Sequence, residues 1–286
     1  MAVPQRIVRR IEDFDGLDSL GRPLAALARR ATRSTVVRNA LSGTWLGHPL
    51  HPMLTDVPIG AWVMAGFLDV LGGSSGQLAA RRLVGLGVLA AIPTAAAGSS
   101  DWAETDDADQ RLGLVHGLGN LTVVALQAGS YLARRRGRRG AGMCLSASGL
   151  GVMTGTAYLG GHLSFNRGVG VNHTAFEKLV TQWTDVASVA GLAPDTPLRV
   201  AADGVPVVLV RREEKIYALS ATCVHAGGPL DEGQLLDGCV RCPWHGSTFR
   251  LSDGTVVRGP AATDEPSWQV RVEGDRIQVR SDIQPG

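Results

Sequence analysis

Two short stretches of this 286-residue chain, Cys223-Val-His225 and Cys242-Pro-Trp-His245, decide how its last third folds and what it can bind. Each stretch supplies one thiol and one imidazole, and sixteen residues separate the two. Two Cys and two His can hold a structural zinc ion, but zinc fingers usually place a Cys pair before a His pair. A two-iron cluster with two Cys on one iron and two His on the other also needs this set. The mixed stretches favour the iron–sulfur cluster, with zinc as the alternative.

The residues around these side chains closely resemble the Rieske [2Fe–2S] family. The first stretch reads Cys-Val-His-Ala-Gly-Gly-Pro-Leu over 223–230, and the second reads Cys-Pro-Trp-His-Gly-Ser-Thr-Phe over 242–249. The resemblance covers about residues 183–281. It implies a buried iron held by the two thiolates and an outer iron, near solvent, held by the two imidazoles. The site residues that it implies are Cys223, His225, Cys242 and His245.

The resemblance also suggests a type within the family. Some Rieske proteins carry an extra Cys in each ligand stretch, and these pair as a disulfide bridge. Ala226 and Trp244 stand in those neighbourhoods here, so the chain resembles the bridge-free, ferredoxin-like type. By the same analogy, the backbone amides of Gly246 and Ser247 and the Ser247 hydroxyl are candidate hydrogen-bond donors to the cluster sulfurs.

Short alternating apolar runs, separated by turn residues, fill the chain from Trp183 onward. Many short strands at this spacing indicate an antiparallel β-sandwich. We therefore predict an all-β Rieske domain over residues 183–281, preceded by a linker over 166–182. The predicted strands lie at 198–201, 205–210, 215–220, 238–241, 247–251, 268–272 and 275–279.

Four longer apolar runs occupy the middle of the chain, and each is about long enough to cross a bilayer. They predict an all-α, four-helix transmembrane bundle over residues 48–165, so the chain is a multi-domain protein. Buried helices of a soluble bundle are the alternative. Small residues such as Gly151 and Gly155 would let neighbouring helices approach closely. The runs are Leu54–Leu71, Leu83–Ser99, Leu114–Ala133 and Ala141–Gly160.

One segment of this region, Gly47-His-Pro-Leu-His-Pro-Met-Leu-Thr-Asp-Val-Pro-Ile-Gly60, resembles an uncharacterised bacterial family of four-helix membrane domains. The resemblance covers about residues 40–165 and implies a membrane location without an activity. Some members of that family look fused to Rieske modules. We therefore expect a multi-pass protein of a bacterial plasma membrane, with the lipid bilayer as one partner.

Charge is distributed unevenly, although the net charge is only +2. Arginines join the first two and the last two apolar runs, while the middle connection is acidic. The positive-inside rule then places both Arg connections in the cytoplasm and the Rieske module outside. Residues 1–47 carry eight Arg and argue against this orientation, because they too would be translocated. Their pattern between Pro23 and Leu41 predicts an amphipathic helix, and no aromatic residues interleave the Arg clusters as in nucleic-acid interfaces.

The histidines at the helix ends lead to a second prediction, a haem or metal site. In an up-down-up-down bundle, four of the seven His meet at one membrane face. Neutral imidazole is a good axial haem ligand, so these His predict a haem b or a second metal site. Hydrogen bonds that cap helix ends are the alternative. The four are His48, His51, His116 and His162, of which the last two are the better ligand candidates.

These features predict a membrane-anchored protein that carries single electrons, with a haem in the membrane domain as an added possibility. No 2-His-1-carboxylate arrangement is visible after the Rieske region, so we expect an electron-transfer component rather than a stand-alone enzyme. The alternatives are a membrane-tethered ferredoxin component for a separate oxygenase, and a redox sensor whose helices serve only as an anchor. The redox partner is a protein or a quinone, and the oligomeric state stays open.

Overall fold

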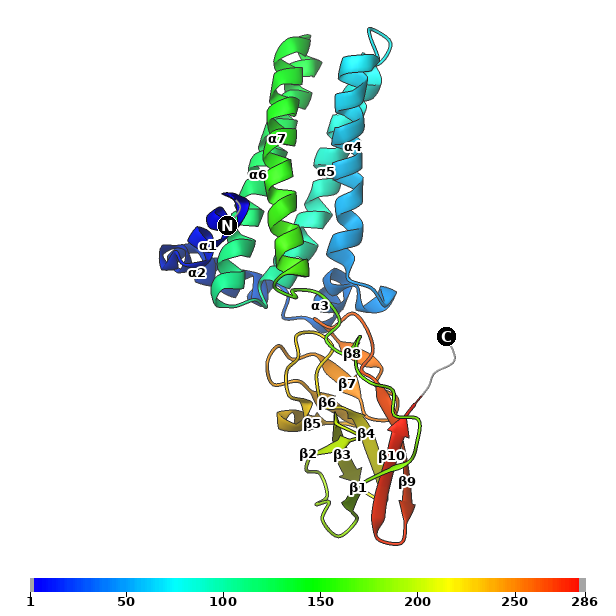
Figure 1. The fold of residues 1–286 in the computed structure, drawn as a ribbon. Helices are drawn as coiled ribbons and strands as arrows, with labels where there is room; N and C mark the ends of the chain where they lie inside the picture. The colour runs from blue at the N-terminus through cyan, green and yellow to red at the C-terminus, as the bar shows by residue number, and fades with distance from the viewer. Residues whose placement is uncertain (1–2, 283–286) are drawn as a thin grey trace. The chain divides into compact units, whose positions relative to one another are not determined.

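The computed structural model describes residues 3–282, which form two compact units (Figure 1). The first unit comprises the chain up to Arg33 together with Leu50–Val169, and the second comprises Ser34–Pro49 together with the chain from Gly170 onward. The segment 34–49 therefore belongs to the unit that contains the ligand stretches, although the sequence had placed it in an Arg-rich N-terminal region.

The described residues contain seven α-helices, six of them in the first unit. Four long helices run side by side in that unit, and two short ones pack beside α6 and α5 (Figure 1). Each predicted apolar run lies inside one long helix. The first unit holds α1 (Val3–Glu12), α2 (Asp18–Ala31), α4 (Leu50–Leu71), α5 (Gln77–Trp102), α6 (Asp107–Arg135) and α7 (Arg139–Phe165).

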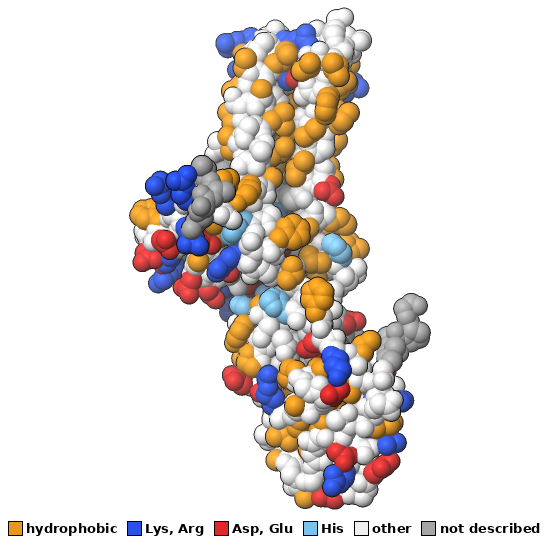
Figure 2. All heavy atoms as spheres, viewed as in Figure 1, with side chains coloured by type: hydrophobic (Ala, Val, Ile, Leu, Met, Phe, Trp, Pro, Cys, Tyr) orange, Lys and Arg blue, Asp and Glu red, His pale blue; other side chains and the backbone are white. Residues whose placement is uncertain are grey.

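Three helices in the described chain, α4, α5 and α6, are long and apolar enough to cross a membrane. The helix α7 is not among them, because many Gly, Ser and Thr residues dilute its hydropathy. The prediction of four apolar spans is therefore correct in the number of long helices, but one of them, α7, is less apolar than predicted. Large apolar side chains cover the outside of the long helices, such as Leu89 at 66% and Leu121 at 65% exposure (Figure 2). An apolar exterior of this kind suits a lipid environment.

Glycines let large side chains of neighbouring helices enter the bundle. A Cβ on Gly87 would collide with the Trp62 indole, and a Cβ on Gly149 would lie 2.9 Å from Nε2 of Gln127. The predicted packing positions, Gly151 and Gly155, are instead exposed, with no atom of the described chain within 4 Å of an added Cβ. The small residues that allow close approach were therefore assigned to the wrong face of α7.

A buried ion pair ties three of the long helices together. Arg134 on α6 donates from Nη1 to Oδ1 of Asp69 on α4 over 2.6 Å and from Nη2 to Oδ2 over 2.5 Å. Its Nε donates to Ser130, whose hydroxyl donates to the Gly142 carbonyl on α7. Both charged side chains are at least 94% buried, since their exposures are 4% and 6%. The bidentate geometry and the extra hydrogen bonds compensate the cost of burying the two charges.

The second unit is built on two antiparallel sheets, which confirms the all-β prediction for this region. A six-stranded sheet has the order β1-β10-β9-β4-β3-β2, and a four-stranded sheet has the order β5-β6-β7-β8. The strands are β1 (Thr184–Ser188), β2 (Leu198–Ala202), β3 (Val205–Arg212), β4 (Lys215–Ser220), β5 (Gln234–Leu236), β6 (Cys239–Arg241), β7 (Thr248–Arg250), β8 (Val256–Arg258), β9 (Ser267–Glu273) and β10 (Arg276–Ser281).

The amphipathic helix predicted between Pro23 and Leu41 is two helices. The helix α2 ends at Ala31 and α3 (Thr35–Ser42) begins after Ser34, whose backbone is extended. The hydroxyl of Thr32 donates to the Ala28 carbonyl at the end of α2. Polar residues that bond to nearby backbone compete with a continuous helix, and this break sends α3 into the second unit.

We predict that Asp69→Ala lowers the free energy of unfolding of the detergent-solubilised protein by about 3–5 kcal/mol, because Arg134 would remain buried without its partner. The measurement is unfolding in increasing denaturant, followed by helical circular dichroism. The matched control is Asp69→Ala combined with Arg134→Met, which removes both charges and should regain most of the loss. Equal loss in the single and double variants would contradict the role of the pair.

A candidate iron–sulfur site

Two loops with the same hydrogen-bond pattern present the four candidate ligands. In the first loop, the Cys223 amide donates to the Gly228 carbonyl over 2.8 Å, and the Gly227 amide donates to the Cys223 carbonyl over 2.8 Å. In the second loop, the Cys242 amide donates to the Ser247 carbonyl over 2.8 Å, and the Gly246 amide donates to the Cys242 carbonyl over 3.1 Å. Each loop is therefore a tight turn that is closed by hydrogen bonds to the backbone amide and carbonyl of its own Cys.

A glycine in the left-handed region makes each turn possible. Gly227 has φ +78° and Gly246 has φ +74°, and each stands four residues after its Cys. Other residues rarely adopt this conformation, because a Cβ would clash with the backbone. The Gly-Gly-Pro and His-Gly-Ser sequences thus follow from the turn geometry.

The structure brings all four predicted ligands together. Cys223 and Cys242 are buried and close enough for one thiol to hydrogen bond to the other. The rings of His225 and His245 are half-buried, with centroids 5.0 Å apart at an interplanar angle of 79°. Within the described chain, no three His, Cys, Asp or Glu side chains converge on one point as a single metal ion requires. This arrangement suits a sulfur pair and an imidazole pair on separate irons better than one tetrahedral zinc.

The space between the loops is kept open by Gly228. A Cβ at this position would lie 2.9 Å from the Sγ of Cys242 and 3.0 Å from the Trp244 ring. Any larger residue would therefore push into the sulfur pair. A [2Fe–2S] cluster fits this cradle, because the thiols face each other there and the imidazoles lie in the same two loops.

Backbone amides of the ligand loops already point at the sulfurs. The His225 amide donates to the thiol of Cys223, and the Trp244 and His245 amides donate to the thiol of Cys242. Of the donors that the sequence nominated, the Gly246 amide donates instead to the Cys242 carbonyl over 3.1 Å. The Ser247 hydroxyl accepts from the Ala261 amide over 3.0 Å, which leaves its own proton to donate.

The protonation of the site follows from its burial and close contacts. Hydrogen bonding from Cys223 lowers the pKa of the Cys242 thiol to about 7, and the same contact together with burial raises the pKa of Cys223. Burial, and then the positive charges of His245, His173 and Arg38, lower the pKa of His225 to about 3. The imidazole of His225 is therefore neutral, which is the form that ligates metals.

A buried carboxyl group behind the first loop was not predicted. Glu265 is 2% exposed. Its Oε2 accepts a hydrogen bond from the Val224 amide over 3.0 Å, and Val224 lies between the two candidate ligands of that loop. Its Oε1 is buried without a hydrogen-bond partner among the described residues. Burial raises its pKa well above the ordinary value for Glu, which favours the protonated form of this side chain. No motif marks it in the sequence.

The predicted linker also contributes to the site. His173 lies in this linker, and its amide donates to the Val224 carbonyl over 3.0 Å. Its ring lies near Gly227, where an added Cβ would be 3.5 Å from Nδ1 of His173. Further along the linker, the Ser281 amide donates to the Val180 carbonyl over 2.8 Å, and the Val180 amide donates to the Ser281 hydroxyl over 2.9 Å, so this stretch is fixed to the β unit.

The four histidines assigned to a haem or second metal do not meet at one point. His48 lies in the second unit, and its Nδ1 faces the Pro49 carbonyl. His51 on α4 and His116 on α6 both lie inside the helical unit, within electrostatic range of each other. The Nδ1 of His51 donates to the Thr94 carbonyl over 3.0 Å.

His116 is held on both of its ring nitrogens. Its Nδ1 donates to the Thr156 carbonyl over 2.8 Å, and its Nε2 accepts the Asn120 amide over 3.0 Å. The carbonyl can only accept, so the Nδ1 carries the proton. Nε2, the atom that could ligate a metal, is therefore engaged.

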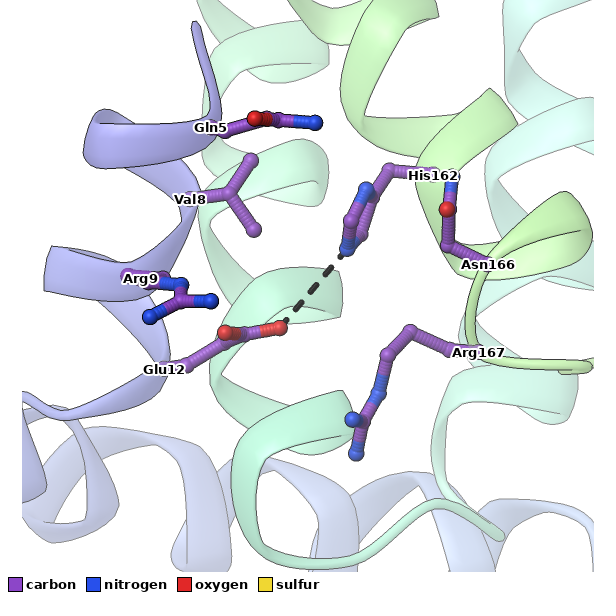
Figure 3. A pocket seen from close by; sticks show the side chains of 7 residues that line it. All are labelled: Gln5, Val8, Arg9, Glu12, His162, Asn166 and Arg167. Atoms are coloured by element: carbon purple, nitrogen blue, oxygen red, sulfur yellow. Dashed lines mark ion pairs between the residues drawn. The ribbon is translucent and has the colours of Figure 1, made fainter. Parts of the chain in front are cut away.

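His162 lines a separate pocket of the helical unit. A cavity of about 280 Å³ lies between α1 and the end of α7, and Figure 3 shows its side chains from close by. Nε2 of His162 lies 3.7 Å from Oε1 of Glu12, a partner that the sequence did not suggest. The lining residues are Gln5, Val8, Arg9, Glu12, His162, Asn166 and Arg167.

Comparison with known proteins covers both halves of the chain. Residues 182–272 match the family model described as Rieske [2Fe-2S] domain, and residues 47–173 match the model described as predicted membrane protein (DUF2231). Human Apoptosis-inducing factor 3 is 38% identical over 78 residues, which make up 27% of this chain. This chain spans only 13% of the length of that relative.

Two ferredoxins are similar over nearly their whole length. The ferredoxin component of biphenyl 2,3-dioxygenase from Rhodococcus jostii is 31% identical over 96 residues, which are 34% of this chain and 90% of that protein. The solved ferredoxin of carbazole 1,9a-dioxygenase from Nocardioides aromaticivorans IC177 is 29% identical, with a TM-score of 0.34. The match covers 36% of this chain and 100% of that ferredoxin.

The turn pair, the facing thiols and the neighbouring imidazoles are thus found in a region that matches a single family model and aligns with nearly a whole ferredoxin. We conclude that the chain belongs to the Rieske [2Fe–2S] family, with a DUF2231 membrane domain preceding the Rieske domain.

Proposed function

We propose that this protein is a membrane-anchored carrier of single electrons with Cys223, His225, Cys242 and His245 as the cluster ligands. The observation that carries the proposal is the division of the ligands into a buried thiol pair and a half-buried imidazole pair. A bound [2Fe–2S] cluster accepts and donates one electron at a time, and its His ligands raise its reduction potential. The chain holds the thiols away from water and leaves the imidazole edge partly open, so an electron can leave at that edge.

The electron acceptor that we favour is an oxygenase. The ferredoxin relatives are described as components of dioxygenases, and they align with this chain over the module that contains the ligands. A quinone is the alternative acceptor, and a redox sensor is the alternative function. Fold similarity alone does not identify a partner. A reduced sample that an oxygenase component reoxidises in single turnovers, but a soluble quinone does not, would support the first.

The ligand assignment predicts which of the four cysteines the cluster needs. Cys223→Ser and Cys242→Ser should each abolish the electron paramagnetic resonance signal of the dithionite-reduced protein, because each removes half of the thiolate pair. Cys144→Ser and Cys239→Ser are matched controls, since both are free cysteines outside the two ligand loops, and they should keep the full signal. A signal that survives in Cys223→Ser, or that disappears in Cys239→Ser, would contradict the assignment.

The DUF2231 region anchors the carrier in our proposal, with α4 to α7 as four spans. The three apolar helices support this, and the exposed apolar side chains of the long helices extend over the same region. The helix α7 pairs closely with α6 and completes the bundle. We further propose that the Arg-rich connection between α6 and α7 faces the cytoplasm, with the Rieske module outside.

The orientation is open to a direct measurement. In right-side-out membrane vesicles, external protease should remove the Rieske domain, because it would be exposed to the medium. Antibody detection of a tag placed after Ser281 reports the cleavage. Full protection in intact vesicles, with cleavage only after detergent is added, would place the domain inside.

A haem in the membrane domain is a second candidate feature, and His51 is the residue that favours it. Because its Nδ1 donates to the Thr94 carbonyl, its Nε2 presents a lone pair, and no partner for that atom is found in the described part of the chain. Metal-ligating histidines commonly use this arrangement. His116 lies nearby but would have to release Asn120 to ligate.

This candidate predicts sharp haem absorption bands in the purified, dithionite-reduced protein. The bands should be lost in His51→Ala and His116→Ala and kept in His162→Ala, since His162 pairs with Glu12 instead. The measurement is the optical spectrum together with haem quantified after extraction. Protein that contains the iron–sulfur cluster and no haem would reduce the helices to an anchor.

A further inference from the structure

One end of the helical unit carries a concentration of arginines. The connection from α4 to α5, residues 72–76, and the connection from α6 to α7, residues 136–138, lie together at this end (Figure 1). Figure 2 shows basic side chains there, next to the apolar surface of the long helices. Seven Arg stand in the second connection or within two helix turns of either one. They are Arg81, Arg82, Arg134, Arg135, Arg136, Arg138 and Arg139.

Hydrogen bonds hold the two connections side by side. Arg139, at the start of α7, donates from Nη2 to the Asp69 carbonyl over 3.3 Å and to the Gly73 carbonyl over 3.5 Å. The Asp69 carboxylate in turn accepts both terminal nitrogens of Arg134 in the buried ion pair. The two connections therefore have fixed positions relative to each other.

The arginines of α5 and α6 lie at the same level of the bundle. A Cβ on Gly85 would lie 2.9 Å from the Tyr131 ring, so the two helices are in close contact there. Arg82 comes three residues before Gly85, and Arg135 comes four residues after Tyr131. About one helix turn therefore separates each Arg from the contact, in the direction of the connections. The guanidinium carbon of Arg135 lies 6.0 Å from the centre of the Tyr131 ring.

Acidic residues do not balance this charge. The sequence has no Asp or Glu over residues 70–100 or over residues 111–173. Asp69 precedes the first of these stretches, but it is buried and bound to Arg134. Four of the other six Arg are exposed, and we call these four the arginine patch. They are Arg82, Arg135, Arg136 and Arg138.

Exposed leucines lie one helix turn deeper than the arginine patch. In α5, Leu86 is 51% exposed and follows Arg82 by four residues. In α6, Leu132 is 49% exposed and precedes Arg136 by four residues. Residues four apart lie on the same face of a helix. Each helix therefore presents a positive charge near the connection and an aliphatic side chain directly beneath it.

We propose that the arginine patch is a binding site for an anionic phospholipid. A phospholipid has the same two parts in the same order, a charged phosphate and then hydrocarbon chains. Guanidinium groups bind phosphate oxygens in a bidentate manner, and basic sites between transmembrane helices bind anionic headgroups. The acyl chains lie along Leu86 and Leu132, which a soluble phosphate compound would leave uncovered. The inference rests on the membrane location in the proposed function and is independent of electron transfer.

The test is lipid binding to the full-length protein in a neutral detergent, measured by native mass spectrometry as the fraction of protein that carries added lipid. The probes are phosphatidylglycerol, which is anionic, and phosphatidylcholine, which has no net charge. Phosphatidylglycerol should bind about tenfold more tightly or better. Glycerol 3-phosphate has the charge without the chains, and an equal concentration of it should not displace the lipid. Equal binding of the two lipids would overturn the proposal.

Variants of the patch test whether its charge is responsible. Arg136→Gln combined with Arg138→Gln should weaken phosphatidylglycerol binding by about 25-fold, at about fivefold for each Arg. Arg136→Lys combined with Arg138→Lys keeps the charge and should keep most of the binding. Arg199→Gln combined with Arg276→Gln removes the same charge from β2 and β10 of the other unit, and it should leave binding unchanged. Equal loss in this control and in the patch variant would contradict a site at the patch.

Leu86→Ala combined with Leu132→Ala separates a lipid from a soluble polyanion, because it keeps every charge. It should weaken phosphatidylglycerol binding by about threefold or more, since the acyl chains lose apolar contact. Full binding in this variant, together with loss in the Arg variant, would assign the patch to a soluble anion and overturn the lipid site. All of these variants lie outside the ligand loops and should keep the electron paramagnetic resonance signal. Absence of that signal in the unaltered protein would instead contradict the proposed function and leave the lipid site intact.

Discussion

The paired turns around Cys223 and Cys242 are the constraint on which the site depends. Each turn is closed by two backbone hydrogen bonds and by a glycine in the left-handed region, so each thiol has a fixed direction before any cluster binds. The same turns aim backbone amides at the sulfurs and leave the imidazoles toward the surface. Binding a cluster therefore requires loss of the thiol protons more than rearrangement of the loops.

In the helical unit, polar side chains lie inside a largely apolar bundle and find their partners within the protein. Asp69 and Arg134 satisfy each other, and Gln127 pairs with Ser146 in the same way. The imidazoles of His51 and His116 each donate to a backbone carbonyl of a neighbouring helix. Such internal pairing is expected where water cannot serve as a partner, and it explains why polar residues persist in long apolar helices.

Much of this could be predicted from the sequence, because ligand spacing and hydrophobic runs are local signals. The four candidate ligands, the four long helices and seven of the strands were located in this way. The strands β1, β5 and β8 were missed; β1 pairs with β10 through an irregular register, and β5 and β8 have only three residues each. Gly151 and Gly155 were misassigned as packing positions, because a helical spacing does not reveal which face of a helix meets its neighbours.

The remaining differences come from contacts between residues far apart in the chain. Glu265 and His173 reach the first ligand loop only through the folded backbone. The pairing of His162 with Glu12 likewise joins the two ends of the helical unit. A histidine at a helix end therefore had several possible partners, and only the fold selects among them.

The most direct test of the central claim is a Mössbauer spectrum of iron-57-labelled, full-length protein, with iron and sulfide counted per chain. We predict two irons and two sulfides per chain, and, in the reduced protein, two equal iron populations in unlike environments, because thiolates ligate one iron and imidazoles the other. A single metal ion per chain, or two irons in the same environment, would contradict the assignment of Cys223, His225, Cys242 and His245.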